Sequence, residues 1–179
     1  MLDALSSRRT KGAIPVTLVT ADRVEAWAAR QPDRVHDWLK STGFKAGPGS
    51  MCLVPNQTGG LARVVVGTND PVGLWDLSAL PNQLPPKRYT LDARLSAERA
   101  GLAALGWALG AYRFERYKSS TKKKEPRAVL EWPKNCDRKA VERAASATAL
   151  VRDLATTPAS HLGPAELADA VRKVAKQHK

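Results

Sequence analysis

One short stretch of the sequence combines four carboxylates with three arginines. A hydrolytic two-metal centre needs several hard oxygen ligands brought to one place. No histidine or cysteine accompanies these carboxylates at the spacing of a metal site, so the pattern favours a surface pair of helices joined by salt bridges over a metal centre. The members of the stretch are Asp22, Arg23, Glu25, Arg30, Asp33, Arg34 and Asp37.

The histidines and cysteines are scattered. His36, His161 and His178 lie far apart, and no serine stands in a Gly-x-Ser-x-Gly elbow beside them. We expect His161, which precedes a glycine in a predicted turn, to make a structural hydrogen bond. Cys52 and Cys136 have no second cysteine nearby, so the sequence predicts neither a disulfide framework nor a zinc site. By this reasoning the 179 residues supply no catalytic residue and no metal ligand.

Positive charge is in excess and concentrated in one segment. The formal net charge is +12, with basic side chains crowded between Arg113 and Arg127. A solvated loop between two elements is the interpretation we favour, and phosphate contact is the alternative. The candidates for nucleic-acid contact are Lys122, Lys123, Lys124 and Arg127.

Short apolar runs separated by turns and helical patterns predict an α/β fold. The run 14–20 is rich in β-branched residues and is typical of a strand, and strands are also predicted at the compact apolar runs 51–54 and 62–67 and at 88–91 and 127–132. The second and third form a predicted hairpin around Asn56 and Gly59. Helices are expected after Asp22, which we expect to cap the first, and after Asp33. We therefore expect a mixed sheet with flanking helices through residue 134.

Three further helices are predicted in the second half. The first runs from Leu91 to Tyr112, because leucines at helical spacing place one stripe on one face. Its glycines would let another element approach closely. The second begins after Asp137 and stops before Pro158, and the third opens at Pro164. No predicted strand follows to cover these last two helices, so we expect them to pack on a body outside these residues, and the chain to be cut in mid-helix.

Two segments resemble the leucyl aminopeptidase family of two-metal exopeptidases. One is Ala104–Lys118, with its Gly110-Ala111-Tyr112-Arg113-Phe114 stretch, and the other is Val151–Ala168, in which an Arg-Asp-Leu helix end is followed by a Thr-Pro turn and a Pro-x-x-Leu helix. In that family the first segment closes the amino-terminal domain and the second opens the catalytic domain. The sequence departs from the family at Thr156 and Ser160, where asparagine is usual.

The resemblance implies an organisation and an activity. Residues 1–134 would form a macro-domain-like amino-terminal domain, 135–157 a linker helix, and 158–179 the beginning of a peptidase domain. The intact protein would be a cytosolic homo-hexamer that uses two divalent metals, manganese or zinc, to remove amino-terminal residues from peptides. The family's metal-binding and catalytic residues match no position here, so this part alone would be inactive.

Two other functions remain open from the sequence. The basic segment leaves a nucleic-acid-binding module as an alternative. A stand-alone ligand-binding α/β domain is the third hypothesis, because the family's amino-terminal domain is similar in fold to domains that bind ADP-ribose, although no nucleotide-binding fingerprint is present. No run of apolar residues is long enough to cross a membrane, and the first residues do not resemble a secretory signal, so we expect a cytoplasmic protein.

Overall fold

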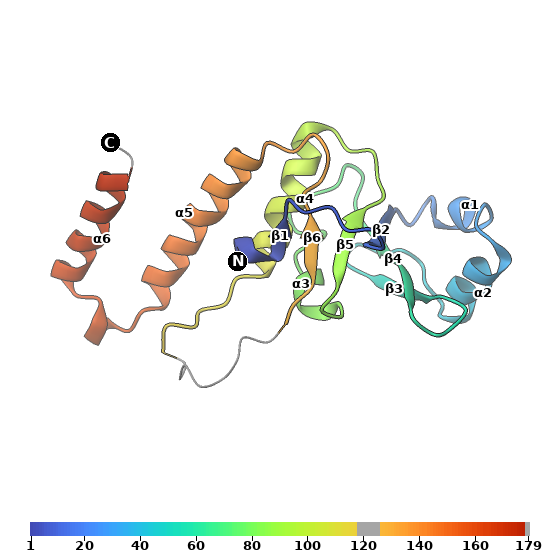
Figure 1. The fold of residues 1–179 in the computed structure, drawn as a ribbon, viewed down its shortest axis with the longest axis horizontal. Helices are drawn as coiled ribbons and strands as arrows, with labels where there is room; N and C mark the ends of the chain where they lie inside the picture. The colour runs from blue at the N-terminus through green and yellow to red at the C-terminus, as the bar shows by residue number, and fades with distance from the viewer. Residues whose placement is uncertain (118–125, 178–179) are drawn as a thin grey trace.

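Strands rich in valine, leucine and isoleucine form one sheet in the computed structural model, which describes residues 1–117 and 126–177 (Figure 1). The order across the sheet is β1-β6-β5-β2-β4-β3, and neighbouring strands are parallel except for the antiparallel pair β3 and β4. The predicted α/β class, with a mixed sheet and flanking helices, is confirmed, as is the hairpin. The strands are β1 (Leu5–Ser6), β2 (Ile14–Val19), β3 (Met51–Pro55), β4 (Leu61–Gly67), β5 (Arg88–Leu91) and β6 (Val129–Glu131).

Helices cover both faces of the sheet. Successive side chains of a strand point to opposite faces, and accordingly Val64 and Val66 enter one apolar core while Val65 enters another. The first core lies under α4 and contains Trp107, and the second lies under α1 and α2. The helices are α1 (Val24–Ala28), α2 (Asp33–Ser41), α3 (Leu80–Gln83), α4 (Ala97–Gly110), α5 (Arg138–Thr156) and α6 (Pro164–Gln177).

The helix expected from Leu91 begins later than predicted. Leu91 lies in β5, and α4 starts at Ala97 after Ser96, whose side chain accepts a hydrogen bond from the Arg99 amide. Its most buried side chains are alanines and Trp107, whereas Leu102 is only half-buried. The leucine stripe does face the core, since Leu109 is buried and Leu105 packs against the same cluster, but α4 is enclosed on further sides, where small residues fit the tightest contacts.

Glycines bring a neighbouring segment against α4, as expected. A Cβ atom on Gly106 would lie 1.8 Å from the Leu74 carbonyl oxygen, and one on Gly110 would lie 1.7 Å from that of Ser78. Real side chains cannot occupy such positions, so the backbone of residues 74–78 packs directly on the helix.

The salt bridges expected in the first helices are formed only in part: Arg23 lies 3.8 Å from Asp22, whereas Arg34 contacts backbone carbonyls. α1 begins after Arg23 without a side-chain cap, so Asp22 is not the cap. Arg34 donates to the carbonyls of Pro55 and Asn56. The guanidinium thus supplies donors at the end of β3, an edge strand, where free carbonyls need them.

The first half of α5 belongs to the main body of the molecule. Asp137 caps the helix by accepting a hydrogen bond from the Ala140 amide at 3.0 Å, as predicted. Val141 and Ala145 are buried in the core under α4, and Val141 lies against Gly101. The expectation that the whole of α5 packs elsewhere is wrong for this half, because Val141 and Ala145 complete the core under α4.

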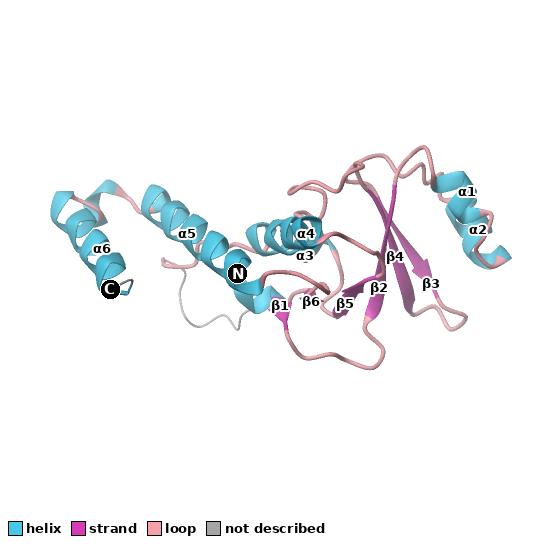
Figure 2. Cartoon of the chain, turned by 90° about the horizontal axis from the view of Figure 1, so that it is seen from above, coloured by secondary structure: helices cyan, strands magenta, loops and turns pink. Residues whose placement is uncertain are grey.

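Beyond Ala145 the chain leaves that core. In both views α5 lies between α4 and α6 (Figure 1 and Figure 2). No residue of α6 is buried, and Val171 is 62% exposed. Among residues 1–117 and 126–177, no helix is long and apolar enough to cross a membrane.

Candidate functional site at the α4–α5 junction

The end of α4 is bonded to the second half of α5. The Tyr112 hydroxyl donates to Asp153 Oδ1 at 2.6 Å, and the Arg152 guanidinium donates to the Leu109 carbonyl at 2.9 Å. The same guanidinium carbon lies 5.3 Å from the centre of the Tyr112 ring, within reach of a cation–π contact. Burial and the hydrogen bond to Asp153 raise the pKa of Tyr112. This tyrosine therefore stays a neutral donor at physiological pH.

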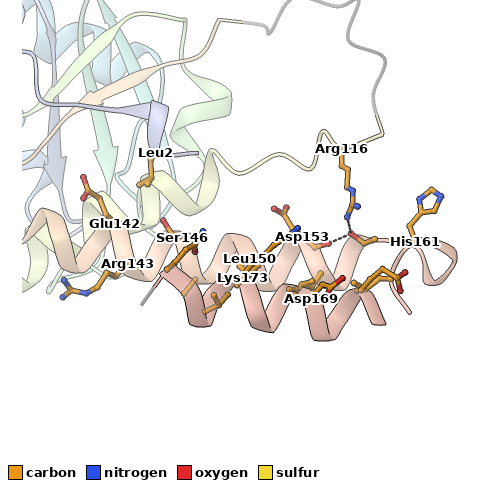
Figure 3. Close-up of a pocket in the computed structure, with 18 residues that line it drawn as sticks. Leu2, Arg116, Glu142, Arg143, Ser146, Leu150, Asp153, His161, Asp169 and Lys173 are labelled. Carbon is orange, nitrogen blue, oxygen red and sulfur yellow. Dashed lines mark hydrogen bonds between the residues drawn. The ribbon is translucent and has the colours of Figure 1, made fainter. Parts of the chain in front are cut away.

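The segment after α4 continues along the end of α5. Arg116 Nη1 donates to Thr157 Oγ1 at 3.3 Å (Figure 3), and Thr157 Oγ1 donates in turn to the Asp153 carbonyl. The Tyr117 hydroxyl lies 2.8 Å from His161 Nδ1, and the two rings are 5.1 Å apart. His161 thus makes the structural hydrogen bond that we expected in the turn.

These contacts join the two segments that carry the family resemblance. We call the set formed by Leu109–Tyr117 with Arg152, Asp153, Thr157 and His161 the junction. Its two halves are about 40 residues apart in sequence: Tyr112 and Asp153 are separated by 41 positions. Sequence reasoning found both segments but not their contact. The residue types could have suggested the contact, because a tyrosine hydroxyl in one segment can donate a hydrogen bond to the aspartate of the Arg-Asp pair in the other.

Beside the junction, a groove runs between α5 and α6. We call it the α5–α6 groove; it has a volume of about 950 Å³ and is lined by apolar side chains that include Leu150, Leu154 and Val174. Charged side chains such as Glu142, Arg143, Asp169 and Lys173 stand around it (Figure 3). Leu150 is 37% exposed. An apolar groove with a charged rim is typical of an interface that another protein surface covers.

The predicted nucleic-acid contacts lie partly outside the described residues. Lys122, Lys123 and Lys124 are not described, so their prediction is untested. Arg127 donates to the Ala111 carbonyl at 2.7 Å and lies 3.8 Å from Asp3. Its guanidinium therefore ties the amino-terminal residues to the end of α4, and neither the described residues nor the similar proteins give support to nucleic-acid binding.

The described residues do not suit a metal centre. Within 1–117 and 126–177, no three His, Cys, Asp or Glu side chains come together closely enough to hold an ion. In the acidic stretch, Asp22 lies 3.8 Å from Arg23, and Arg23 also pairs with Asp70 at 3.1 Å. A hydrogen bond from Thr20 lowers the pKa of Asp22. We derive no catalytic step through metals from this part of the protein.

Comparisons with known proteins give the family. Residues 14–131 match the M17 aminopeptidase N-terminal domain. The chain is 30% identical over 161 residues to a probable cytosol aminopeptidase of Exiguobacterium sibiricum, a match that covers 82% of the chain and 34% of that protein. The chain therefore spans about a third of that relative's length.

Solved structures of similar proteins point to the same family. The cytosol aminopeptidase from Coxiella burnetii is 35% identical with a TM-score of 0.87, over 98% of this chain and 38% of that one. The bottromycin maturation enzyme BotP in complex with Mn is 26% identical with a TM-score of 0.69, over 93% of this chain and 37% of that one. A tomato leucine aminopeptidase, at 17% identity and a TM-score of 0.65, shares the fold. The sheet, the helices that flank it and these matches place the chain in the M17 aminopeptidase family, whose amino-terminal domain it contains.

Proposed function

We propose that these residues form the amino-terminal domain and the opening helices of a metal-dependent aminopeptidase, and that the α5–α6 groove seats the peptidase body. Residues 1–134 are the amino-terminal domain, 135–157 the connecting helix and 158–179 the beginning of the peptidase domain. The whole protein releases amino-terminal residues from peptides in the cytoplasm, using two divalent metals, manganese or zinc, and assembles as a homo-hexamer.

The observation that carries the proposal is the exposure of α6 beside a fixed α5. Leu167 and Val171 are 47% and 62% exposed, in a helix with no buried residue. An amphipathic helix of this kind gains most of its stability by packing its apolar face. The matched relatives are more than twice as long as this chain, which supports a further body as the cover.

The junction gives that cover a fixed orientation. Tyr112, Arg116 and Tyr117 hold α5 and the turn at His161 by side-chain contacts. Because these bonds restrain the end of α5, they also restrain where α6 starts. We propose that this part positions the peptidase body relative to the sheet domain and contributes no atom to the chemistry.

A chimera tests this function. The 179 residues replace the matching part of the Coxiella burnetii cytosol aminopeptidase, and metal-dependent hydrolysis of a leucine anilide is measured. The variant Leu150→Glu with Val174→Glu places two charges on side chains that line the groove. We expect activity and assembly to fall by about tenfold or more, since buried unpaired charges are strongly destabilising.

The matched control is Leu53→Glu on β3, where the side chain is 37% exposed and far along the chain from the groove. It should leave the activity of the chimera within about twofold, as surface substitutions usually do. Equal activity in the groove double variant and the unmodified chimera would refute the role of the groove.

A further inference from the structure

A separate cavity lies at the carboxyl ends of three adjacent parallel strands. Its volume is about 510 Å³, and its walls come from the segments that follow β1, β6 and β5. These wall segments include Arg9, Pro133–Asn135 and Asp92–Leu95. In open α/β sheets, ligands bind in the crevice outside the carboxyl ends of the strands. The cavity is also within the size range of ligand sites.

Basic side chains from all three segments line this cavity. Arg9 follows β1, Arg94 follows β5 and Lys134 follows β6. Neither Arg94 nor Lys134 has a hydrogen-bond or ion-pair partner for its side chain in the part of the chain that the structure describes. Two cations without a counter-charge beside one cavity raise the local concentration of anions.

Arg9 is held at the cavity by a buried carboxylate. Glu131 is only 3% exposed; one of its oxygens lies 3.2 Å from Arg9 Nη1 and the other accepts from the Thr10 amide at 2.6 Å. Arg9 Nη2 donates to the Trp132 carbonyl. Burying a carboxylate is unfavourable unless it is paired, and here the pairing fixes the direction of one guanidinium. Further N–H groups of Arg9 remain for a ligand.

One carboxylate faces the same cavity. Asp92 accepts a hydrogen bond from Thr17 at 3.4 Å, and its Oδ2 lies 3.9 Å from Arg63. Arg63 therefore offsets its charge, as Arg9 offsets that of Glu131. The positive charges at the cavity that no carboxylate offsets are those of Arg94 and Lys134.

We propose that this cavity binds a diphosphate group, with Arg94 and Lys134 as direct contacts and Arg9 as a positioned third donor. Two phosphoryl groups match the two uncompensated cations, and charge-assisted hydrogen bonds to phosphate are stronger than neutral ones. The site is distinct from the junction. The cavity borders the start of α5 and the junction its end, and the 19 residues of α5 span about 28 Å.

The test uses the 179-residue chain with inorganic pyrophosphate at millimolar concentration, in a phosphate-free buffer of low ionic strength, followed by amide NMR. We expect shift changes at residues 90–95 and at Lys134 and Asn135. Arg94→Ala and Lys134→Ala should each weaken binding by about tenfold. Lys40→Ala, on the exposed end of α2, removes the same charge elsewhere and should weaken it by less than about twofold.

A second arm replaces pyrophosphate by ADP. Tighter binding of ADP would support a nucleoside diphosphate as the ligand, and equal binding would support the free diphosphate. Shift changes that are absent, or that fall equally in all three alanine variants, would overturn the site, because they would leave only the general attraction of a basic protein for anions. This outcome is independent of the chimera experiment, which probes the other end of α5.

Discussion

Two helices of equal length have opposite surroundings in this chain. α4 and α6 each contain 14 residues. Seven residues of α4 are buried, from Ala100 to Leu109, whereas none of α6 is. α4 consists largely of alanine, leucine and glycine, and α6 carries a branched apolar stripe that includes Leu167 and Val171.

The difference shows how side-chain size decides where a helix can lie. Small residues let α4 sit between the sheet, residues 74–78 and α5, so that contact is made largely by backbone and Trp107. The larger stripe of α6 has no such neighbour among the described residues. A helix with one apolar stripe is stabilised by one covering surface, so the two helices should respond to substitution in opposite ways.

The largest effect is expected from Gly106→Ala. The new methyl group would overlap the Leu74 carbonyl, and relieving this contact must separate α4 from residues 74–78. We expect a loss of about 3 kcal/mol in the free energy of unfolding, at the upper end of overpacking effects. Urea denaturation followed by circular dichroism measures it.

Gly101→Ala is the matched control. Its Cβ would meet only the Val141 side chain at 3.9 Å, an ordinary contact. Alanine favours helix over glycine by about 1 kcal/mol, so this variant should be equally stable or more so. If both substitutions had the same effect, the direct backbone packing of α4 would be disproved.

A smaller effect is expected beneath α4 at Tyr89. The ring is fully buried and packs on Trp107, and its hydroxyl donates to the Pro85 carbonyl at 2.9 Å. Tyr89→Phe leaves that carbonyl without its donor, so we expect a loss of about 1 to 2 kcal/mol at neutral pH.

The same variant should change the response to alkaline pH. Burial raises the pKa of Tyr89 from 10.0 to about 12. The folded state thus favours the neutral phenol; its contribution to stability is fully present below pH 10 and is lost as the pH rises from about 10 towards 12. The wild-type protein should lose more stability than Tyr89→Phe over that interval. Parallel decreases in both proteins would argue against a buried hydroxyl.

Local patterns were enough to predict most of the sheet and the ends of several helices. A β-branched run predicted β2, short apolar runs predicted the hairpin β3–β4, β5 was also predicted, and capping chemistry predicted the start of α5 at Asp137. The boundary of α4 was missed because Leu91 and Leu95 continue the leucine spacing by coincidence. β5 takes Leu91 instead, because a strand pairing with β2 is a tertiary contact that periodicity does not contain.

The candidate site was predictable only as two separate pieces. Tyr112 and Asp153 were each part of a recognised segment, but their hydrogen bond depends on how α4 and α5 pack, and that packing is made by Val141 and Ala145 in the shared core. Likewise, Arg9, Arg94 and Lys134 follow three different strands, and the strand order that places them around one cavity is not a local property. Long-range topology is the information that the residue patterns lacked.

At the junction we expect a local effect of about 1 kcal/mol. Tyr112→Phe removes the bond to Asp153 while keeping the ring under Arg152. Amide hydrogen exchange should become faster in the second half of α5 and in α6, with little change around Val141 and Ala145, which the main core holds. Uniform acceleration along α5 would show that the helix opens as one unit and that the junction does not secure its end.

The smallest effect is expected on α6. Val171 is 62% exposed, so Val171→Ser should change the free energy of unfolding of the 179-residue chain by no more than about 0.5 kcal/mol. Val141→Ser makes the same replacement at a side chain that is 5% exposed, and a buried hydroxyl without a partner should cost about 2 kcal/mol. A loss at Val171 as large as that at Val141 would mean that the stripe of α6 is already covered within this chain. The contrast between α4 and α6 would then disappear, and with it the reason to place a further protein body on the exposed stripe of α6.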